Sequence, residues 1–213
     1  EVFDFGPWRF IQYANQNFTA AYFDYNGRYS FGRQPEAALW ALTQLGKSFN
    51  KLINEKRIIE ILNEFSTTFH LSLKRHFCWR IGIQDIDTKS LSEIMNVLLN
   101  ESEKHKIEFA SFFYDFFGGK EAVIDCLKTN YGNKYKVEGF LKITDILKDS
   151  QSSKGALEKR KLINNNRENM LIDEVEQIWE EINKNNNWKL LKKKISKVRK
   201  LGNSLESQKL VNF

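Results

Sequence analysis

The first residues of the chain include a carboxylate placed where it could bind a metal ion. Val2 and Phe3 have the apolar character of a strand end, and they lead into Asp4, Phe5 and Gly6. A small, hard cation such as Mg²⁺ prefers anionic oxygen ligands, which a carboxylate at a rigid strand end supplies. Gly6 allows the backbone to turn sharply after that carboxylate. The stretch therefore predicts Asp4 as a Mg²⁺ ligand, with an acidic residue at an ordinary strand-to-turn junction as the alternative.

Three further motifs follow this opening stretch. Residues 24–29 read Asp-Tyr-Asn-Gly-Arg-Tyr, residues 34–35 read Gln-Pro, and residues 39–42 read Leu-Trp-Ala-Leu. Together with Asp-Phe-Gly-Pro at 4–7, this combination closely resembles the selenoprotein O family, the YdiU-like proteins. The resemblance is dense over residues 2–45 and looser over the helices expected out to residue 118.

The resemblance implies a mainly α, protein-kinase-like C-lobe portion of a fold that is α+β in the whole family. It implies a pseudokinase-like transferase that moves AMP from ATP to Ser, Thr or Tyr hydroxyls of substrate proteins. ATP and Mg²⁺ would be the cofactors, with Asp4 and Gly6 at the nucleotide and Asp4 on the metal. The Gly-rich loop, strand Lys and catalytic loop would precede Glu1. We therefore expect no catalytic-loop residue in this chain and an inactive fragment, with the missing elements either on absent sequence or on a separate N-terminal half that acts as a partner.

Two positions depart from the family pattern. Ala41 follows Trp40 where the family usually has Asn, and no cysteine follows Pro7. The first change removes an amide that could brace the loop, and the second removes any redox coupling through that position. A split, truncated or decaying gene product is one explanation of these departures.

The composition predicts three segments, 1–128, 129–170 and 171–213. Residues 10–34 lack periodicity and predict a long, ordered loop before a helix that opens at Gln34-Pro35, since proline is tolerated at the first helical position. The second segment is rich in Asn, Lys, Gly and Ser and predicts a loosely packed polar connector, with a helical turn or two at 156–163. The third segment predicts a pair of helices, the last of them basic.

Apolar spacing predicts several helices within the first segment. Leu39, Trp40 and Leu42 would form the buried face of the first helix, and one amphipathic helix would cover 58–69. A capping box is predicted at residues 90–93. The phenylalanines at 109, 112, 113, 116 and 117 predict a core stripe that ends at two glycines, with a ligand groove as the alternative, and a short helix follows at 122–127.

The net charge of +6 lies entirely in residues 151–213, which contain 14 Lys and Arg against 8 Asp and Glu. The densest part is Lys192-Lys193-Lys194 with Lys197, Arg199 and Lys200. A non-catalytic helical module that binds nucleic acid or an acidic partner through this helix is the alternative function. Trp188, Leu191, Ile195 and Val198 recur at helical spacing between the lysines, which favours a solvated helix face.

Other chemistry receives less support. His70, His76 and Cys78 lie close in sequence, but a closed zinc site needs four ligands at short spacings. Ser66 and His70 could share a helix face as a hydrolase pair, but no oxyanion signature accompanies them. Arg28 would pair with a buried carboxylate or contact phosphate, and the first is favoured. Two distant cysteines and no apolar run long enough to span a bilayer predict a reduced, cytoplasmic protein without membrane contact.

Overall fold

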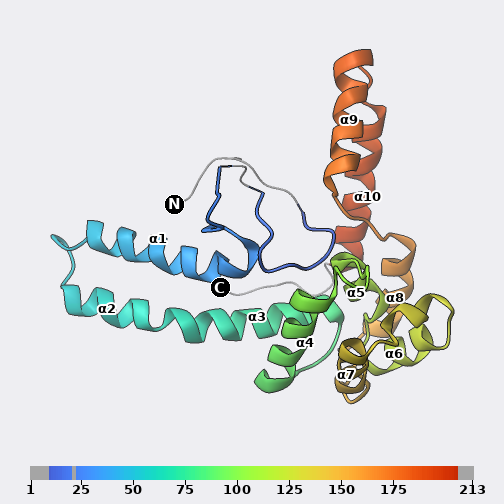
Figure 1. The fold of residues 1–213 in the computed structure, drawn as a ribbon, viewed down its shortest axis with the longest axis horizontal. Helices are drawn as coiled ribbons and strands as arrows, with labels where there is room; N and C mark the ends of the chain where they lie inside the picture. Colours follow the sequence, from blue (N-terminus) through green and yellow to red (C-terminus); the bar gives the residue numbers. More distant parts are fainter. Residues whose placement is uncertain (1–9, 21–22, 206–213) are drawn as a thin grey trace. The chain divides into compact units, whose positions relative to one another are not determined.

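The computed structural model describes residues 10–20 and 23–205, and it confirms a mainly helical fold (Figure 1). Within this described part no strand is formed, and the only β contacts are two isolated antiparallel bridges, Tyr13 with Glu108 and Ile83 with Ser152. The elements in chain order are η1 (Phe31–Arg33), α1 (Gln34–Ser48), α2 (Glu55–Asn63), α3 (Phe65–Ile81), α4 (Thr88–Glu101), α5 (Phe109–Asp115), α6 (Lys120–Leu127), η2 (Tyr131–Tyr135), α7 (Glu138–Lys148), α8 (Ala156–Asn165), α9 (Ile172–Asn185) and α10 (Lys189–Leu205).

The chain folds into two compact units. Of the described residues, the first unit contains 15–20 and 23–77, and the second contains 10–14 and 78–205. Helix α3 begins in the first unit and ends in the second. None of the described helices is both long and apolar enough to cross a membrane.

The first unit begins with the irregular segment that the sequence predicts. Helix α1 starts at Gln34 with Pro35 at its first turn, as predicted, and lies beside α2 (Figure 1). The two helices approach closely at Gly46, where an added Cβ would lie 2.7 Å from Cγ2 of the buried Ile58. The predicted burial of Leu39, Trp40 and Leu42 is wrong, because these side chains are exposed and Trp40 is 49% accessible.

The single amphipathic helix predicted for 58–69 is two elements. Helix α2 ends at Asn63, Glu64 is its C-terminal cap, and α3 begins at Phe65. Both helices run in nearly the same direction in Figure 1. The Thr68 amide still donates to the Glu64 carbonyl at 3.0 Å, so the interruption is local. Apolar periodicity alone does not reveal a one-residue break of this kind.

The phenylalanine stripe forms the core of the second unit, as predicted. Phe112 and Phe116 are fully buried, and their rings meet edge to face with centroids 5.2 Å apart. The Phe116 ring lies 4.5 Å from that of the buried Tyr135. The stripe ends at Gly118 and Gly119, both with positive φ, and the short helix α6 follows as predicted. Burial of these rings in a well-packed core excludes the ligand-groove alternative for this stripe.

The prediction of a loosely packed connector at 129–170 is wrong, although the helical turns predicted at 156–163 are confirmed as part of α8. This segment contains η2, α7 and α8, and α7 packs against both α4 and α6. Phe140, Ile143 and Leu147 on α7 are fully buried, and so is Ile163 on α8. Polar composition concealed this structure, because each helix contributes only one narrow apolar face to the core.

Helix α4 begins earlier than the predicted capping box. Its N-cap is Asp87, whose carboxylate accepts a hydrogen bond from the Ser90 amide at 3.0 Å. Ser90 therefore lies in the first turn as a donor. Asp87 therefore caps this helix, and the predicted cap at Ser90 is wrong because an acidic acceptor precedes it.

Helices α9 and α10 form a hairpin of adjacent helices (Figure 1). They confirm the predicted helical pair, but burial on α10 differs from the prediction. Trp188, Ile195 and Val198 are exposed, whereas Lys194 is only 4% accessible. Two carboxylates neutralise the amine of Lys194, which permits its burial. A basic residue is therefore buried on this helix where apolar residues were expected to be, and the apolar residues are exposed.

Candidate functional site

The predicted metal and nucleotide residues, Asp4 and Gly6, lie outside the described residues. Among the described residues, the Asp-Tyr-Asn-Gly-Arg-Tyr motif contains Arg28, the residue considered for contact with phosphate. We call residues 24–30 the Asp24 turn. It lies in the first unit, shortly before η1 and α1.

Backbone hydrogen bonds to one side chain order the Asp24 turn. The Asp24 carboxylate accepts from the Arg28 amide at 2.9 Å and from the Tyr29 amide at 2.7 Å. The Gly27 amide donates to the Asp24 carbonyl at 3.1 Å, and Gly27 has φ +61°, a conformation that favours glycine. The turn closes on Ser30, which is buried. The acid and the glycine of this motif therefore have a structural role, which is to fix the backbone around Arg28.

A close backbone approach fixes the end of the loop beside α1. The Gly32 amide donates to the Gln16 carbonyl at 2.8 Å, and the Phe31 amide donates to the Phe18 carbonyl at 2.8 Å. A Cβ on Gly32 would lie 2.8 Å from Cβ of Gln16, so any side chain here would force the two segments apart. The segment before the Asp24 turn and the segment after it are thereby joined.

Arg33 and Glu36 form a two-pronged ion pair at the start of α1. The Arg33 Nε and Nη2 atoms donate to the Glu36 carboxylate at 2.8 and 2.9 Å. The hydrogen bond and charge of Arg33 lower the pKa of Glu36, and those of Glu36 raise the pKa of Arg33. Both side chains are exposed, so this pair positions the helix start and contributes little to stability.

The favoured prediction for Arg28, an ion pair with a buried carboxylate, finds no partner among the described residues. Its side chain is exposed and makes no ion pair with a carboxylate of the described residues. Because the backbone of Arg28 is fixed by Asp24 while its guanidinium extends into solvent, the arrangement suits contact with an external anion.

The histidines considered for zinc or hydrolytic chemistry bind backbone carbonyls instead. His70 Nδ1 donates to the Ser66 carbonyl at 2.6 Å, and His76 Nδ1 donates to the Ser72 carbonyl at 2.8 Å. A His70 Nδ1 that donates to a carbonyl does not act as a base toward the Ser66 hydroxyl, which lies 3.5 Å away. Over the described ranges, no cluster of three or more His, Cys, Asp or Glu could hold a metal.

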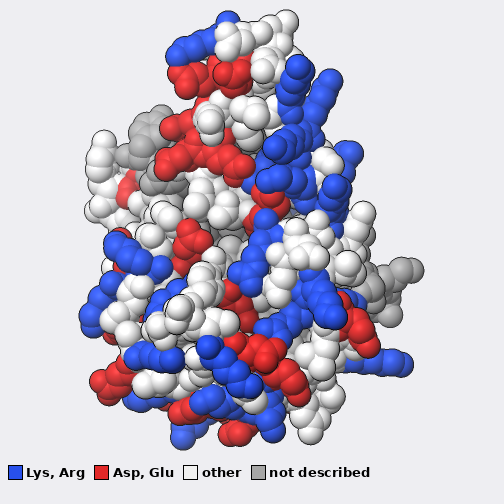
Figure 2. Space-filling model, turned by 90° about the vertical axis from the view of Figure 1, so that its right-hand side faces the viewer, with Lys and Arg blue, Asp and Glu red and all other residues white. Residues whose placement is uncertain are grey.

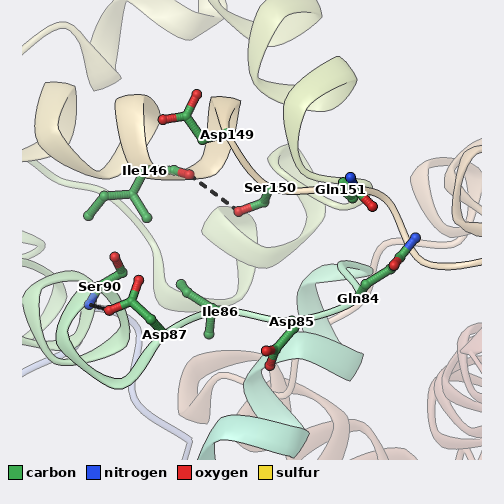
Figure 3. A pocket seen from close by; sticks show the side chains of 9 residues that line it. All are labelled: Gln84, Asp85, Ile86, Asp87, Ser90, Ile146, Asp149, Ser150 and Gln151. Atoms are coloured by element: carbon green, nitrogen blue, oxygen red, sulfur yellow. Dashed lines mark hydrogen bonds between the residues drawn. The ribbon is translucent and has the colours of Figure 1, made fainter.

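An open pocket of about 500 Å³ lies in the second unit between the segment before α4 and the end of α7 (Figure 3). Asp85, Asp87 and Asp149 line it together with neutral side chains. The Asp87 carboxylate is committed to the N-cap of α4, and the Ser150 hydroxyl donates to the Ile146 carbonyl at 3.3 Å. Three carboxylates disfavour phosphate by charge, so this pocket is not a candidate for a nucleotide site.

Two buried ionic networks could not be foreseen from the sequence. The first joins α10 to the segment before α9 and to α9 itself. Lys194 Nζ donates to Glu168 at 2.6 Å and to Glu174 at 2.5 Å, and Lys197 Nζ donates to Glu168 at 2.7 Å. Burial opposes the charge on Lys194, but the hydrogen bonds to both glutamates outweigh it and raise the pKa of Lys194. Burial likewise opposes charge on Glu168, but the two lysines lower its pKa.

The second network surrounds Asp115 at the end of α5. Its carboxylate accepts from the Tyr135 hydroxyl at 2.5 Å and from Arg167 Nη1 at 2.6 Å, and Lys134 Nζ lies 3.2 Å away. Burial and the adjacent Asp115 raise the pKa of Tyr135, so its hydroxyl remains a donor. The same two influences raise the pKa of the Cys126 thiol to about 11. These groups tie η2 and Arg167 to the core and present no reactive atom.

Comparison with known proteins places the opening motifs in a family. The sequence profile described as "Protein adenylyltransferase SelO" matches residues 1–199. A protein nucleotidyltransferase YdiU of Trichormus variabilis is 30% identical over 115 residues, which are 54% of this chain and 24% of the relative. The YdiU protein of Synechocystis is 42% identical over 69 residues, 32% of this chain and 14% of that protein. The YdiU protein of Vibrio cholerae is 29% identical over 132 residues, 59% of this chain and 26% of that protein.

These matches span about a quarter or less of the length of each relative. They agree with the resemblance inferred from the residues at 4–7, 24–29 and 34–42. Because the family profile covers nearly the whole sequence, from residue 1 to residue 199, the assignment does not depend on one motif. The chain belongs to the SelO family.

Proposed function

We propose that this chain is part of a protein nucleotidyltransferase that transfers AMP from ATP to Ser, Thr or Tyr hydroxyls of substrate proteins. In this reaction the hydroxyl oxygen forms a bond to the α-phosphorus of ATP, and the bond to pyrophosphate breaks. The hydroxyl proton leaves, and pyrophosphate departs with the electron pair of the broken bond. The 213 residues correspond to a helical, kinase-C-lobe-like portion, with 1–128 as the portion next to the nucleotide and 171–213 as its C-terminal helical pair.

The single observation that carries this proposal is the family match over residues 1–199, since the matched relatives are named protein nucleotidyltransferases. The Asp24 turn supports it. Its backbone is fixed by Asp24 and Gly27, and it leaves the Arg28 guanidinium exposed near the start of α1. A fixed backbone beneath a solvent-exposed cation is suited to binding phosphate oxygens with little loss of entropy.

In this proposal Asp4 holds Mg²⁺, Gly6 gives the backbone the freedom to present that carboxylate, and Arg28 contacts the phosphates of ATP. The donor chemistry fits, since a carboxylate oxygen is the ligand that Mg²⁺ prefers. A bound Mg²⁺ would neutralise charge on the phosphates. Further metal ligands, the Gly-rich loop and the catalytic loop belong to sequence outside these 213 residues.

A chimera tests the proposal. In the Trichormus variabilis relative, this chain replaces the segment that it matches, and the product is given ATP labelled at the α- or the γ-phosphate. We expect label to enter protein from α-labelled ATP only, because AMP transfer releases the β- and γ-phosphates together. Incorporation of γ-label would indicate phosphoryl transfer and would contradict the proposal. The 213-residue chain alone is the negative control, and we expect no transfer from it.

The same chimera tests Arg28. We expect Arg28→Ala to raise the KM for ATP and to leave the thermal midpoint unchanged, since the side chain makes no ion pair among the described residues. A lowered midpoint with an unchanged KM would assign Arg28 a structural role instead.

A further inference from the structure

Helix α10 carries an exposed row of cations on one side. Five of its basic side chains are exposed: Lys189, Lys192, Lys193, Arg199 and Lys200. Consecutive residues of an α-helix turn by about 100°, so these five positions fall within an arc of about 120° around the helix axis. We call these five residues the basic stripe. In the upper part of Figure 2, at the height of the α9–α10 hairpin, Lys and Arg side chains gather along one side.

The basic stripe lies opposite the side of α10 that anchors the helix. Leu201 and Leu205 pack against the hydrophobic core of the second unit. Lys194 is buried and is neutralised by two carboxylates. By the same helical spacing, these three residues point roughly 140–180° away from the centre of the stripe. The cations of the stripe are thus separate from the contacts that hold α10 in the fold.

The charge of the basic stripe is not compensated within the helix. Across the part of the chain that the structure describes, its five cations form no ion pair. On other helices, exposed cations pair with an acid one turn away, as Arg57 does with Glu60 on α2 and Lys148 with Asp145 on α7. Helix α10 has no Asp or Glu among its 17 residues, so such pairs cannot form. The stripe therefore differs from the solvated helix faces elsewhere in this protein.

The arrangement of these cations also weakens their own helix. Lys189 lies three and four residues before Lys192 and Lys193, and like charges at these spacings repel each other. Lys189 is the first residue of α10, whose first turn contains no acid, and a cation there opposes the helix dipole. Helix α9 shows the stabilising arrangement, with Asp173 and Glu174 in its first turn. A row of charge that costs its helix stability indicates a role in binding an external anion.

We propose that the basic stripe binds the phosphate backbone of a nucleic acid without reading its base sequence. The other two residues within the arc, Ser196 and Asn203, are exposed and polar. Lysine, arginine, serine and asparagine are side chains that contact phosphate in nucleic-acid complexes. From Lys189 to Lys200 the stripe rises about 16 Å, at about 1.5 Å per residue, so it can face several successive phosphates. The inference does not depend on the proposed nucleotidyl transfer.

An anionic membrane or an acidic protein fits the basic stripe less well. A helix that lies on a membrane buries its apolar side in the bilayer, but Leu201 and Leu205, opposite the stripe, are already packed against the core. Protein interfaces depend on apolar or aromatic side chains at their centre. The arc contains none, since the exposed Ile195 falls outside it and Trp188 precedes α10. A phosphate backbone needs only cations and small polar side chains.

Fluorescence anisotropy with the 213-residue chain and a labelled DNA duplex of about 20 base pairs tests the proposal. A second duplex of the same composition and scrambled sequence tests whether bases are read. The stripe variant replaces three lysines of the basic stripe by glutamine. The control variant replaces three exposed lysines elsewhere in the second unit, so that both variants lose the same charge. The stripe variant is Lys189→Gln, Lys193→Gln and Lys200→Gln, and the control is Lys128→Gln, Lys136→Gln and Lys142→Gln.

We expect the wild-type chain to bind both duplexes equally and more weakly as salt rises, because bound cations release counterions from the phosphates. Each phosphate contact adds about 0.9 to the slope of log Kd against log salt concentration, so five contacts give a slope of about 4.5. The stripe variant should lower this slope to about 2 and raise the Kd roughly tenfold or more at about 0.05 M NaCl. The control variant should keep the wild-type slope. The thermal midpoint of the stripe variant should stay the same or rise, because repulsion along α10 is relieved.

A wild-type chain that binds neither duplex at roughly 100 µM protein and about 0.05 M NaCl would overturn the proposal, since non-specific binding is tighter than this even at physiological salt. An unchanged slope in the stripe variant, or an equal loss in the control variant, would overturn it as well. A lowered thermal midpoint in the stripe variant would assign these lysines to the fold instead. Binding to vesicles of phosphatidylcholine and phosphatidylserine, or to a glutamate-rich peptide, without binding to DNA would assign the stripe to a membrane or to an acidic protein.

Discussion

Neighbouring lysines on α10 occupy opposite environments. Lys193 is exposed and makes no ion pair with any described residue, whereas Lys194 is buried and donates to Glu168 and Glu174. The difference follows from helical geometry, because consecutive residues point about 100° apart. Charge identity alone therefore does not tell which lysine holds the hairpin together and which one is available to a partner.

Replacement of the buried lysine should destabilise the protein strongly. We expect Lys194→Met to lower the free energy of unfolding by roughly 3 kcal/mol, because two partly buried carboxylates lose their counter-charge. The matched control, Lys193→Met, should change it by less than about 0.5 kcal/mol. Urea denaturation of both variants measures the two changes in the free energy of unfolding. Equal effects would show that the Lys194 network does not stabilise the fold.

The network should also make stability depend on pH in the acid range. The pKa of Glu168 is lowered in the folded state, so its stabilising effect is present above its unfolded pKa of about 4.3 and is lost as pH falls through the lower folded pKa. We expect Glu168→Gln to cost the most near neutral pH and progressively less below about pH 4. Denaturation across this range measures the trend. Glu176→Gln, at an exposed position, is the control, and a pH-independent loss for Glu168→Gln would contradict the assignment.

Among the elements, those with a local signal were predictable from the sequence. Pro35 marked the start of α1, and the phenylalanine stripe with its two glycines marked α5 and its end. The burial of Phe140 and Ile163 was missed, because polar neighbours hide a narrow apolar face until tertiary packing selects it. The burial of Lys194 depends on Glu168, which is 26 residues away in sequence. No local pattern encodes such a pair.

The start of α4 offers a test at the scale of one element. Asp87 caps this helix by accepting from the Ser90 amide, and hydrogen bonds from the Ser90 side chain and then from its amide lower the pKa of Asp87. We expect Asp87→Ala to lower the free energy of unfolding by about 1 kcal/mol, because a helix N-terminal donor loses its acceptor. Asp87→Asn keeps an acceptor oxygen and should retain most of the stability. Chemical denaturation compares the two, and equal losses would rule out the cap as the cause.

At the scale of the whole molecule, the chain has two compact units and matches about a quarter or less of each relative compared here. The mainly helical class followed from apolar periodicity, and the family followed from motifs within the first 45 residues. The proposed metal and nucleotide site could not be derived from the sequence in the same way. Asp24 and Gly27 proved to be backbone-ordering residues of the Asp24 turn, whereas Asp4 stays a prediction that rests on its residue type and on the family match.

The most direct test of the central claim is the rate of Mg²⁺-dependent AMP transfer by the chimera with Asp4 and with Asp4→Asn. Asparagine keeps the size and one oxygen of the side chain but removes the negative charge that attracts a divalent ion. We predict a loss of roughly 10²-fold or more, about 3 kcal/mol of transition-state stabilisation, with an unchanged thermal midpoint. An Asp4→Asn chimera that keeps near-wild-type Mg²⁺-dependent transfer would contradict the assignment of this stretch to the metal site.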